Sequence, residues 1–126
     1  MTKKARYDLQ QVFAIIDSGK TGCIWFPAPS RSVLAVVRVY EKTATPKDLN
    51  EAKEFILAGI RALKDGDFVD HNYQWETTHD IYGIVVDGRP WYVKFCIDGD
   101  GDLSQVSFHP PERELKTVDG HIIAAG

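Results

Sequence analysis

Residues 80–97 read DIYGIVVDGRPWYVKFCI, and residues 103–109 read LSQVSFH. Two runs rich in β-branched and aromatic residues meet at Asp87 and Gly88, a pair typical of a two-residue hairpin turn because both turn positions need positive φ. A second Gly- and Asp-rich reversal, at residues 98–102, leads into the third run. The sequence therefore predicts three consecutive antiparallel strands, a β-meander. So small a sheet is not stable alone, and the preceding residues must cover one of its faces.

Two helices are predicted in the first 40 residues. The first covers residues 8–17, where Asp8 can act as the N-cap. Its apolar residues recur at helical spacing: Leu9, Val12, Phe13 and Ile16. Residues 31–40 are rich in valine, so their periodicity leaves a helix or a buried strand open. Ser30, a residue type that favours helix N-caps, makes the helix the preferred interpretation.

A third helix is predicted from Thr45, as N-cap, through Pro46 at the first helical position to about Leu63. Residues 66–79 are polar and aromatic, and we expect a connection there, with a short strand of its own as an open alternative. Together these patterns predict an α+β fold in which about three N-terminal helices pack on one face of a C-terminal antiparallel β-meander. We expect a single domain over residues 1–126, with residues 112–126 as a loosely attached tail.

Composition restricts the classes of function. The chain has 126 residues and a net charge of −3. It contains no apolar run near the ~18 residues of a membrane span and no apolar segment typical of a secretory signal. Cys23 and Cys96 lack the spacing of a disulfide framework and are expected to be reduced. We therefore expect a cytoplasmic protein without a membrane partner. The sheet-forming half is acidic: residues 66–126 carry 4 Lys and Arg against 11 Asp and Glu.

Strand periodicity assigns the side chains of the meander to two faces. On the middle strand, Tyr92, Lys94 and Cys96 alternate with the apolar residues between them. On the last strand, strict alternation places Leu103, Gln105, Ser107 and His109 together. The resulting core face carries Val93, Phe95, Val106 and Phe108. The opposite face, with Tyr92, Lys94, Gln105, Ser107 and His109, is polar enough to face solvent.

Such a polar face suits RNA cleavage without a metal ion. A 2′-hydroxyl must lose a proton and a 5′-oxygen must gain one, and histidine serves both steps near neutral pH. The candidate catalytic residues are His71, His79, His109 and Tyr92. The candidate substrate-binding residues are Lys94, Gln105 and Ser107. Scattered solvated side chains are the alternative interpretation of this pattern.

The sequence predicts no metal site and no cofactor. Residues 98–102, DGDGD, resemble the start of a calcium loop, but the position after them is Leu103 rather than Gly, and His109 stands where a bidentate Glu would be needed. We predict a hairpin turn there. His71 and His79 have no third ligand at a zinc-site spacing.

The chain resembles the MqsR family of toxin–antitoxin mRNA interferases, which have a RelE-like fold. The resemblance spans residues 6–109 and consists of short motifs in a matching order: Tyr7-Asp8-Leu9, Arg31-Ser32-Val33-Leu34, Ala62-Leu63, Asp67-Phe68, Asp80-Ile81-Tyr82, Tyr92-Val93-Lys94-Phe95 and Val106-Ser107-Phe108. It implies an α+β domain that cuts RNA on its open sheet face, without a metal ion, and is neutralised by a cognate antitoxin.

The resemblance also implies where the site residues lie. The family's tyrosine before Val/Leu-Lys is retained as Tyr92. His79 stands where the family has Gln before Asp-Val-Tyr, His109 where it has Lys after Ser-Phe, and Asp70 and His71 where it has Lys after Asp-Phe. These changes imply a variant ribonuclease site based on histidines.

The leading hypothesis is a metal-independent endoribonuclease toxin whose partners are RNA and a protein antitoxin, with a homodimer left open. His109 or His79 is its general base, another histidine its acid, and Tyr92 and Lys94 contact the scissile phosphate. The alternative is a non-catalytic protein-binding module of the same fold, whose interface patch contains Trp25, Phe26, Trp75 and Trp91.

Overall fold

The computed structural model describes residues 3–20, 22–26 and 30–126. Its helices are α1 (Leu9–Asp17), α2 (Arg31–Tyr40), α3 (Leu49–Arg61) and the short 3-10 helix η1 (Asp65–Asp67). A four-stranded antiparallel sheet follows in the order β1-β2-β3-β4, formed by Phe68–Gln74, Thr77–Val86, Arg89–Ile97 and Leu103–His109. A two-stranded sheet, β5 (Leu115–Lys116) and β6 (Ile122–Ile123), ends the chain.

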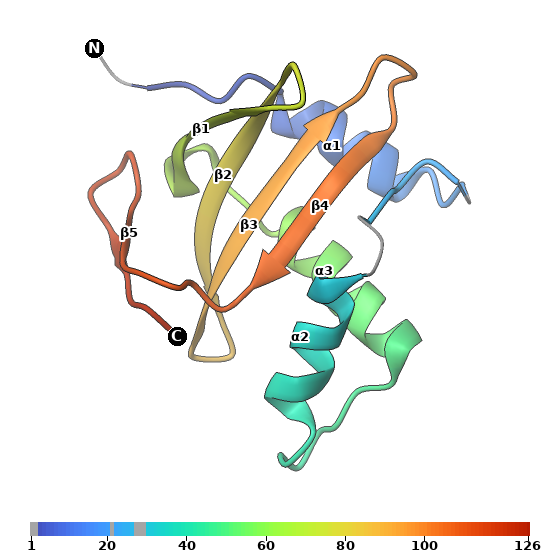
Figure 1. The fold of residues 1–126 in the computed structure, drawn as a ribbon, viewed down its shortest axis with the longest axis vertical. Coiled ribbons are helices and arrows are strands. Elements are labelled where there is room, and N and C mark those ends of the chain that lie inside the picture. The colour runs from blue at the N-terminus through green and yellow to red at the C-terminus, as the bar shows by residue number, and fades with distance from the viewer. Residues whose placement is uncertain (1–2, 21, 27–29) are drawn as a thin grey trace.

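The three α-helices cover one face of the four-stranded sheet and leave the other toward the viewer in Figure 1. The predicted core face is correct, because Val93, Phe95, Val106 and Phe108 are all fully buried. They pack with apolar residues of α1, α2 and α3 in a single core cluster. The α+β architecture predicted from the sequence is therefore present. Among the described residues, no helix has the length and apolar character that crossing a membrane requires.

The helix predictions hold except at the start and end of α3. Asp8 caps α1 by accepting a hydrogen bond from the Gln10 amide, and residues 31–40 are helical, although the Ser30 hydroxyl makes no capping bond. The N-cap of α3 is Asp48, not Thr45, and the helix ends at Arg61. Asp48 and Glu51 form a reciprocal capping box, with bonds of 2.8 and 3.1 Å, and this satisfies two amides at once.

The sheet contains one strand more than the predicted meander. Asp87 and Gly88 both have positive φ, which confirms the two-residue turn between β2 and β3. Residues 98–102 are a turn, as predicted, and Asp98 Oδ1 accepts bonds of 3.0 Å from two amides within it. The added strand is β1, which pairs with β2 at the edge of the sheet.

A β-bulge in β4 changes the predicted face of one residue. Lys94 pairs with Ser107, but Cys96 pairs with Ser104, so one extra residue lies between these pairs on β4. Gln105 adopts φ +52° within this bulge. Strict alternation placed Leu103 on the open face, whereas the bulge shifts the parity and buries Leu103 in the core.

The C-terminal residues, expected to be a loosely attached tail, fold against the sheet. Leu115, Thr117 and Ile123 are buried, and the Val118 amide donates to the Phe68 carbonyl at 2.8 Å. The contact depends on Gly83 of β2, where an added Cβ would lie 3.0 Å from Ile123 Cγ1 and 3.2 Å from Leu115 Cδ1. We call residues 112–126 the C-terminal hairpin. It packs against Gly83 and lies beside β2 in Figure 1.

Candidate functional site

Four of the predicted site residues line one hollow on the open face. Tyr92 pairs with His109 and Lys94 pairs with Ser107, so β3 and β4 place the four side chains side by side. The C-terminal hairpin supplies the facing wall. We call this cavity of about 230 Å³ the central hollow, and its lining is Tyr92, Lys94, Ser107, His109, Glu112, Arg113 and Leu115.

His109 is held in an orientation that leaves one ring nitrogen available. Its ring stacks on Tyr92, with centroids 4.7 Å apart and planes 18° from parallel. Its Nδ1 lies 2.8 Å from the Pro110 carbonyl oxygen, which can only accept a hydrogen bond. In the neutral ring the proton is therefore on Nδ1, and Nε2 carries the lone pair. That arrangement suits a general base.

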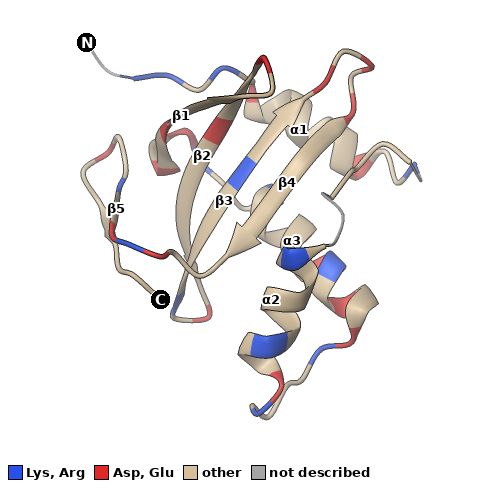
Figure 2. Ribbon diagram, viewed as in Figure 1, with Lys and Arg blue, Asp and Glu red and all other residues tan. Residues whose placement is uncertain are grey.

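Lys94 brings positive charge to the middle of the sheet, where Figure 2 shows a basic position within β3, and acidic residues follow in the β3–β4 turn. Its Nζ lies 3.3 Å from the Gln74 side-chain oxygen. Burial lowers the pKa of Lys94 and raises the pKa of Tyr92, and the charge of Glu112 also raises that of Tyr92. An ammonium group with a lowered pKa gives up its proton more readily and is a better general acid.

His79 lies outside the central hollow, at an open-face position of β2. It is fully buried, and burial lowers its pKa. In the described part of the chain, neither ring nitrogen has a hydrogen-bond partner at ordinary distance. A second hollow of about 300 Å³ reaches it between the β1–β2 turn and the β3–β4 turn. We call this the tip hollow, and its lining is Trp75, Thr77, His79, Cys96, Ile97, Asp98, Gly99, Ser104 and Gln105. Gln105 therefore belongs with His79 rather than with Lys94.

His71 does not belong to either hollow. Its Nδ1 lies 3.1 Å from Oδ1 of Asp80. Asp80 directly follows His79 on β2, so its side chain points to the face opposite the open one. Asp80 is buried and also accepts bonds of 2.9 and 2.8 Å from the amides of Arg6 and Tyr7. Position 71 thus supports the attachment of the N-terminal segment, and the prediction that His71 shares a site with His109 is not met by this geometry.

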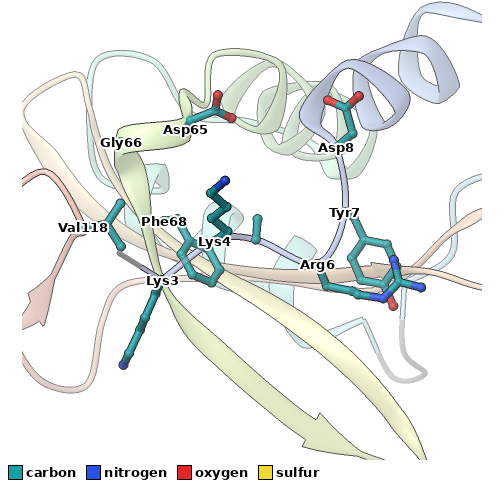
Figure 3. Close-up of a pocket in the computed structure, with 10 residues that line it drawn as sticks. Lys3, Lys4, Arg6, Tyr7, Asp8, Asp65, Gly66, Phe68 and Val118 are labelled. Atoms are coloured by element: carbon teal, nitrogen blue, oxygen red, sulfur yellow. The ribbon is translucent and has the colours of Figure 1, made fainter. Parts of the chain in front are cut away.

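A hollow of about 610 Å³ lies beside that N-terminal segment. Figure 3 shows Lys3 and Lys4 pointing apart, with the carboxylates of Asp8 and Asp65 on the same rim as Lys4. Lys3 forms an exposed ion pair with Asp70 at 3.1 Å. Charges of both signs line this hollow, so it lacks the concentrated positive charge of a phosphate site.

Three residues of the central hollow escaped the sequence analysis: Glu112, Arg113 and Leu115. Glu112 and Arg113 lie in residues 112–126, which show no strand or helix pattern, and only the charged run Glu112-Arg113-Glu114 marks them. The aromatic interface patch of the alternative hypothesis does not form as expected, because Trp91 is fully buried. Both cysteines are free, as predicted.

Within the described ranges, no three His, Cys, Asp or Glu side chains gather closely enough to hold a metal ion. Comparison with protein-family models, curated proteins and solved structures gave no match to this chain. The likeness to the MqsR family therefore rests on the sequence motifs alone.

Proposed function

We propose that this protein is a metal-independent endoribonuclease that acts as the mRNA-cleaving toxin of a toxin–antitoxin system. The observation that carries the proposal is the central hollow. It combines a histidine with an available Nε2, an ammonium group whose pKa is lowered and a guanidinium group. These are the groups that proton transfer at a phosphodiester requires.

In the proposed reaction, Nε2 of His109 takes the proton of an RNA 2′-hydroxyl. The 2′-oxygen forms a bond to the adjacent phosphorus, and the bond from phosphorus to the 5′-oxygen breaks. Lys94 gives its proton to the departing 5′-oxygen, so the products are a 2′,3′-cyclic phosphate and a 5′-hydroxyl. The role of acid passes to Lys94 because His79 lies outside the central hollow and His71 faces Asp80.

The remaining groups of the central hollow stabilise the negative charge on the phosphate and hold the general base, His109, in place. Arg113 offers a planar, permanently charged donor to the non-bridging phosphate oxygens, whose negative charge grows in the transition state. Tyr92 fixes the His109 ring by stacking on it. Glu112 lines the hollow beside Arg113, and its charge raises the pKa of Tyr92. Lys94 and Arg113 thus supply local positive charge within an acidic half of the protein.

The RNA substrate and the protein antitoxin follow from the resemblance and from this chemistry. An antitoxin that blocks the central hollow would neutralise the enzyme by excluding RNA from His109. Such a partner must be able to contact the exposed edge formed by Glu112 and Arg113.

The test is incubation of purified protein with single-stranded RNA in excess EDTA. We expect fragments with 2′,3′-cyclic phosphate ends, and a loss of about 10²- to 10⁴-fold in rate for His109→Ala and for Lys94→Ala. His121→Ala is the matched control, because His121 is exposed in the C-terminal hairpin and does not line the central hollow. Full activity of His109→Ala would remove the proposed base. Intact RNA with the wild-type protein would overturn the ribonuclease and favour the binding-module alternative.

A further inference from the structure

The tip hollow has an exposed aromatic rim and a polar floor. Trp75, at its rim, is 67% exposed. His79, at its floor, packs against the edge of the Trp75 indole, with ring centroids 6.0 Å apart and planes at 76°. Its volume of about 300 Å³ is at the small end of ligand sites, which run from roughly 300 to 1,000 Å³. It therefore suits one flat ring better than a large ligand.

His79 leaves its hydrogen-bonding capacity unused in the folded protein. Among the described residues, neither Nδ1 nor Nε2 has a partner at ordinary hydrogen-bonding distance, although the side chain is fully buried. Such orphaned groups are rare because each costs free energy, and they call for an explanation. A neutral imidazole carries one N–H donor and one acceptor. One donor and one acceptor are also what the edge of a nucleobase presents, so the two can form hydrogen bonds with each other.

The backbone of Trp75 lies in the left-handed region, which is costly for a bulky residue. Trp75 and Glu76 form the two-residue turn between β1 and β2, with φ of +51° and +58°. Asn and Gly adopt these angles readily, whereas a bulky residue does so at a cost. An exposed tryptophan in this position gives no core packing in return. Its aromatic face is available for stacking on a base, an interaction that is indifferent to sequence.

The charge of the tip hollow argues for a base and against a phosphate. None of its nine lining residues is Lys or Arg, and Asp98 contributes a carboxylate. Phosphate would be repelled there, whereas the amino groups of bases are attracted to an acceptor. The cations lie in the central hollow on the same sheet face. Lys94 and Cys96, one from each hollow, are two residues apart on β3, which is about 7 Å and the length scale of a single nucleotide.

We propose that the tip hollow is a nucleobase subsite, in which Trp75 stacks on a base next to the scissile phosphate and His79 hydrogen-bonds its edge. This inference rests on the proposed ribonuclease function, since it places the base relative to a phosphate at Lys94. It assigns the protein single-stranded RNA as substrate, because a base paired in a helix cannot turn into the hollow. It also makes the tip hollow the origin of any preference for a base at the cleavage site.

The subsite is tested by binding, separately from cleavage. The probe is a fluorescently labelled 2′-O-methyl hexaribonucleotide, which lacks the attacking hydroxyl, together with the same oligonucleotide made abasic at its central positions. We expect Trp75→Ala to weaken binding of the intact probe roughly 5- to 100-fold, and Trp75→Phe to restore most of it. The wild-type protein and Trp75→Ala should bind the abasic probe equally. Tyr73→Ala is the control, because Tyr73 is equally exposed on β1 but alternates with the open-face residues.

The two proposals fail in different ways. Cleavage by the wild-type protein with no effect of Trp75→Ala on binding, or an equal effect on both probes, would overturn the base subsite and leave the ribonuclease standing. Binding that depends on Trp75 and on the bases, without any cleavage of ordinary RNA, would keep the subsite and overturn the catalytic assignment. Failure of the wild-type protein to bind the intact probe would overturn the subsite.

Discussion

Gly59, in the middle of α3, offers a sharp test of how closely the helices pack on the sheet. A Cβ at this position would lie 2.8 Å from Cζ and 2.9 Å from Cε2 of Phe108 on β4. The Phe108 ring has little room to move, since Trp91 and Phe55 pack on it with centroids 5.0 and 5.9 Å away. We therefore predict that Gly59→Ala lowers the free energy of unfolding.

The expected magnitude follows from two effects of opposite sign. Alanine is favoured over glycine by about 1 kcal/mol in a helix interior. Overpacking a filled core costs about 1–3 kcal/mol. The net result is a loss of up to about 2 kcal/mol in the free energy of unfolding. Urea unfolding measures it as a lower midpoint at an unchanged m value. Because Phe108 directly precedes His109, we also expect RNA cleavage to slow.

A double-mutant cycle separates the steric effect from helix propensity. Phe108→Leu removes the atoms that would clash, so in that background Gly59→Ala should become stabilising. Gly99→Ala is the matched control, because Gly99 lies in an exposed turn with no neighbouring atom within 4 Å of a new Cβ. A stabilising effect of Gly59→Ala in the wild-type protein, or the same effect in both backgrounds, would refute the close contact between α3 and β4.

Three other changes test the structure elsewhere. Asp80→Asn should lower the free energy of unfolding in urea by about 2–4 kcal/mol, because a buried carboxylate that accepts several hydrogen bonds becomes an amide that is partly a donor. Asp70→Asn is the control and should lower it by less than about 1 kcal/mol, because Asp70 forms an exposed ion pair. Burial lowers the pKa of His79, so the unfolded chain takes up a proton there before the folded protein does as the pH falls below about 6.5. The free energy of unfolding should therefore fall by up to about 1.4 kcal/mol per pH unit. His79→Gln should remove this contribution, as measured by thermal unfolding at pH 5 to 7. Ile123→Asp should detach the C-terminal hairpin from Gly83, giving early proteolysis after Pro111 and slower RNA cleavage while the circular dichroism of the main sheet is retained.

Local pattern was sufficient to predict the middle of the fold. Alternation along β3 and the turn at Asp87 and Gly88 define both the strand pairing and the buried face. Together they bring Tyr92, Lys94, Ser107 and His109 to one side of the sheet, as expected. The bulge at Gln105 was not predictable, because a single extra residue leaves the apolar pattern of the strand almost unchanged.

The parts that were missed or left open owe their structure to distant contacts. β1 is an edge strand whose residues 70–74 are polar on both sides, so its period is not visible in the sequence. Without an assigned strand, the sequence does not say which face of the sheet His71 occupies. Its position beside Asp80 rather than His109 could therefore not be predicted. The C-terminal hairpin has strands of two residues each, and its place depends on the missing side chain of Gly83.

The C-terminal hairpin also makes the two ends of the open sheet face different. Leu115 and Ile123 occupy the surface over Gly83, so the face is covered beyond Tyr92 by the chain itself. A polymer whose phosphate lies at Lys94 therefore has the hairpin on one side and the tip hollow on the other. Along β3, the residue after next from Lys94 is Cys96, which lines the tip hollow together with Trp75. On the proposed function, the hairpin thus acts as a wall that steers the bound RNA strand toward the base subsite, and Gly83 is the residue that makes room for the wall.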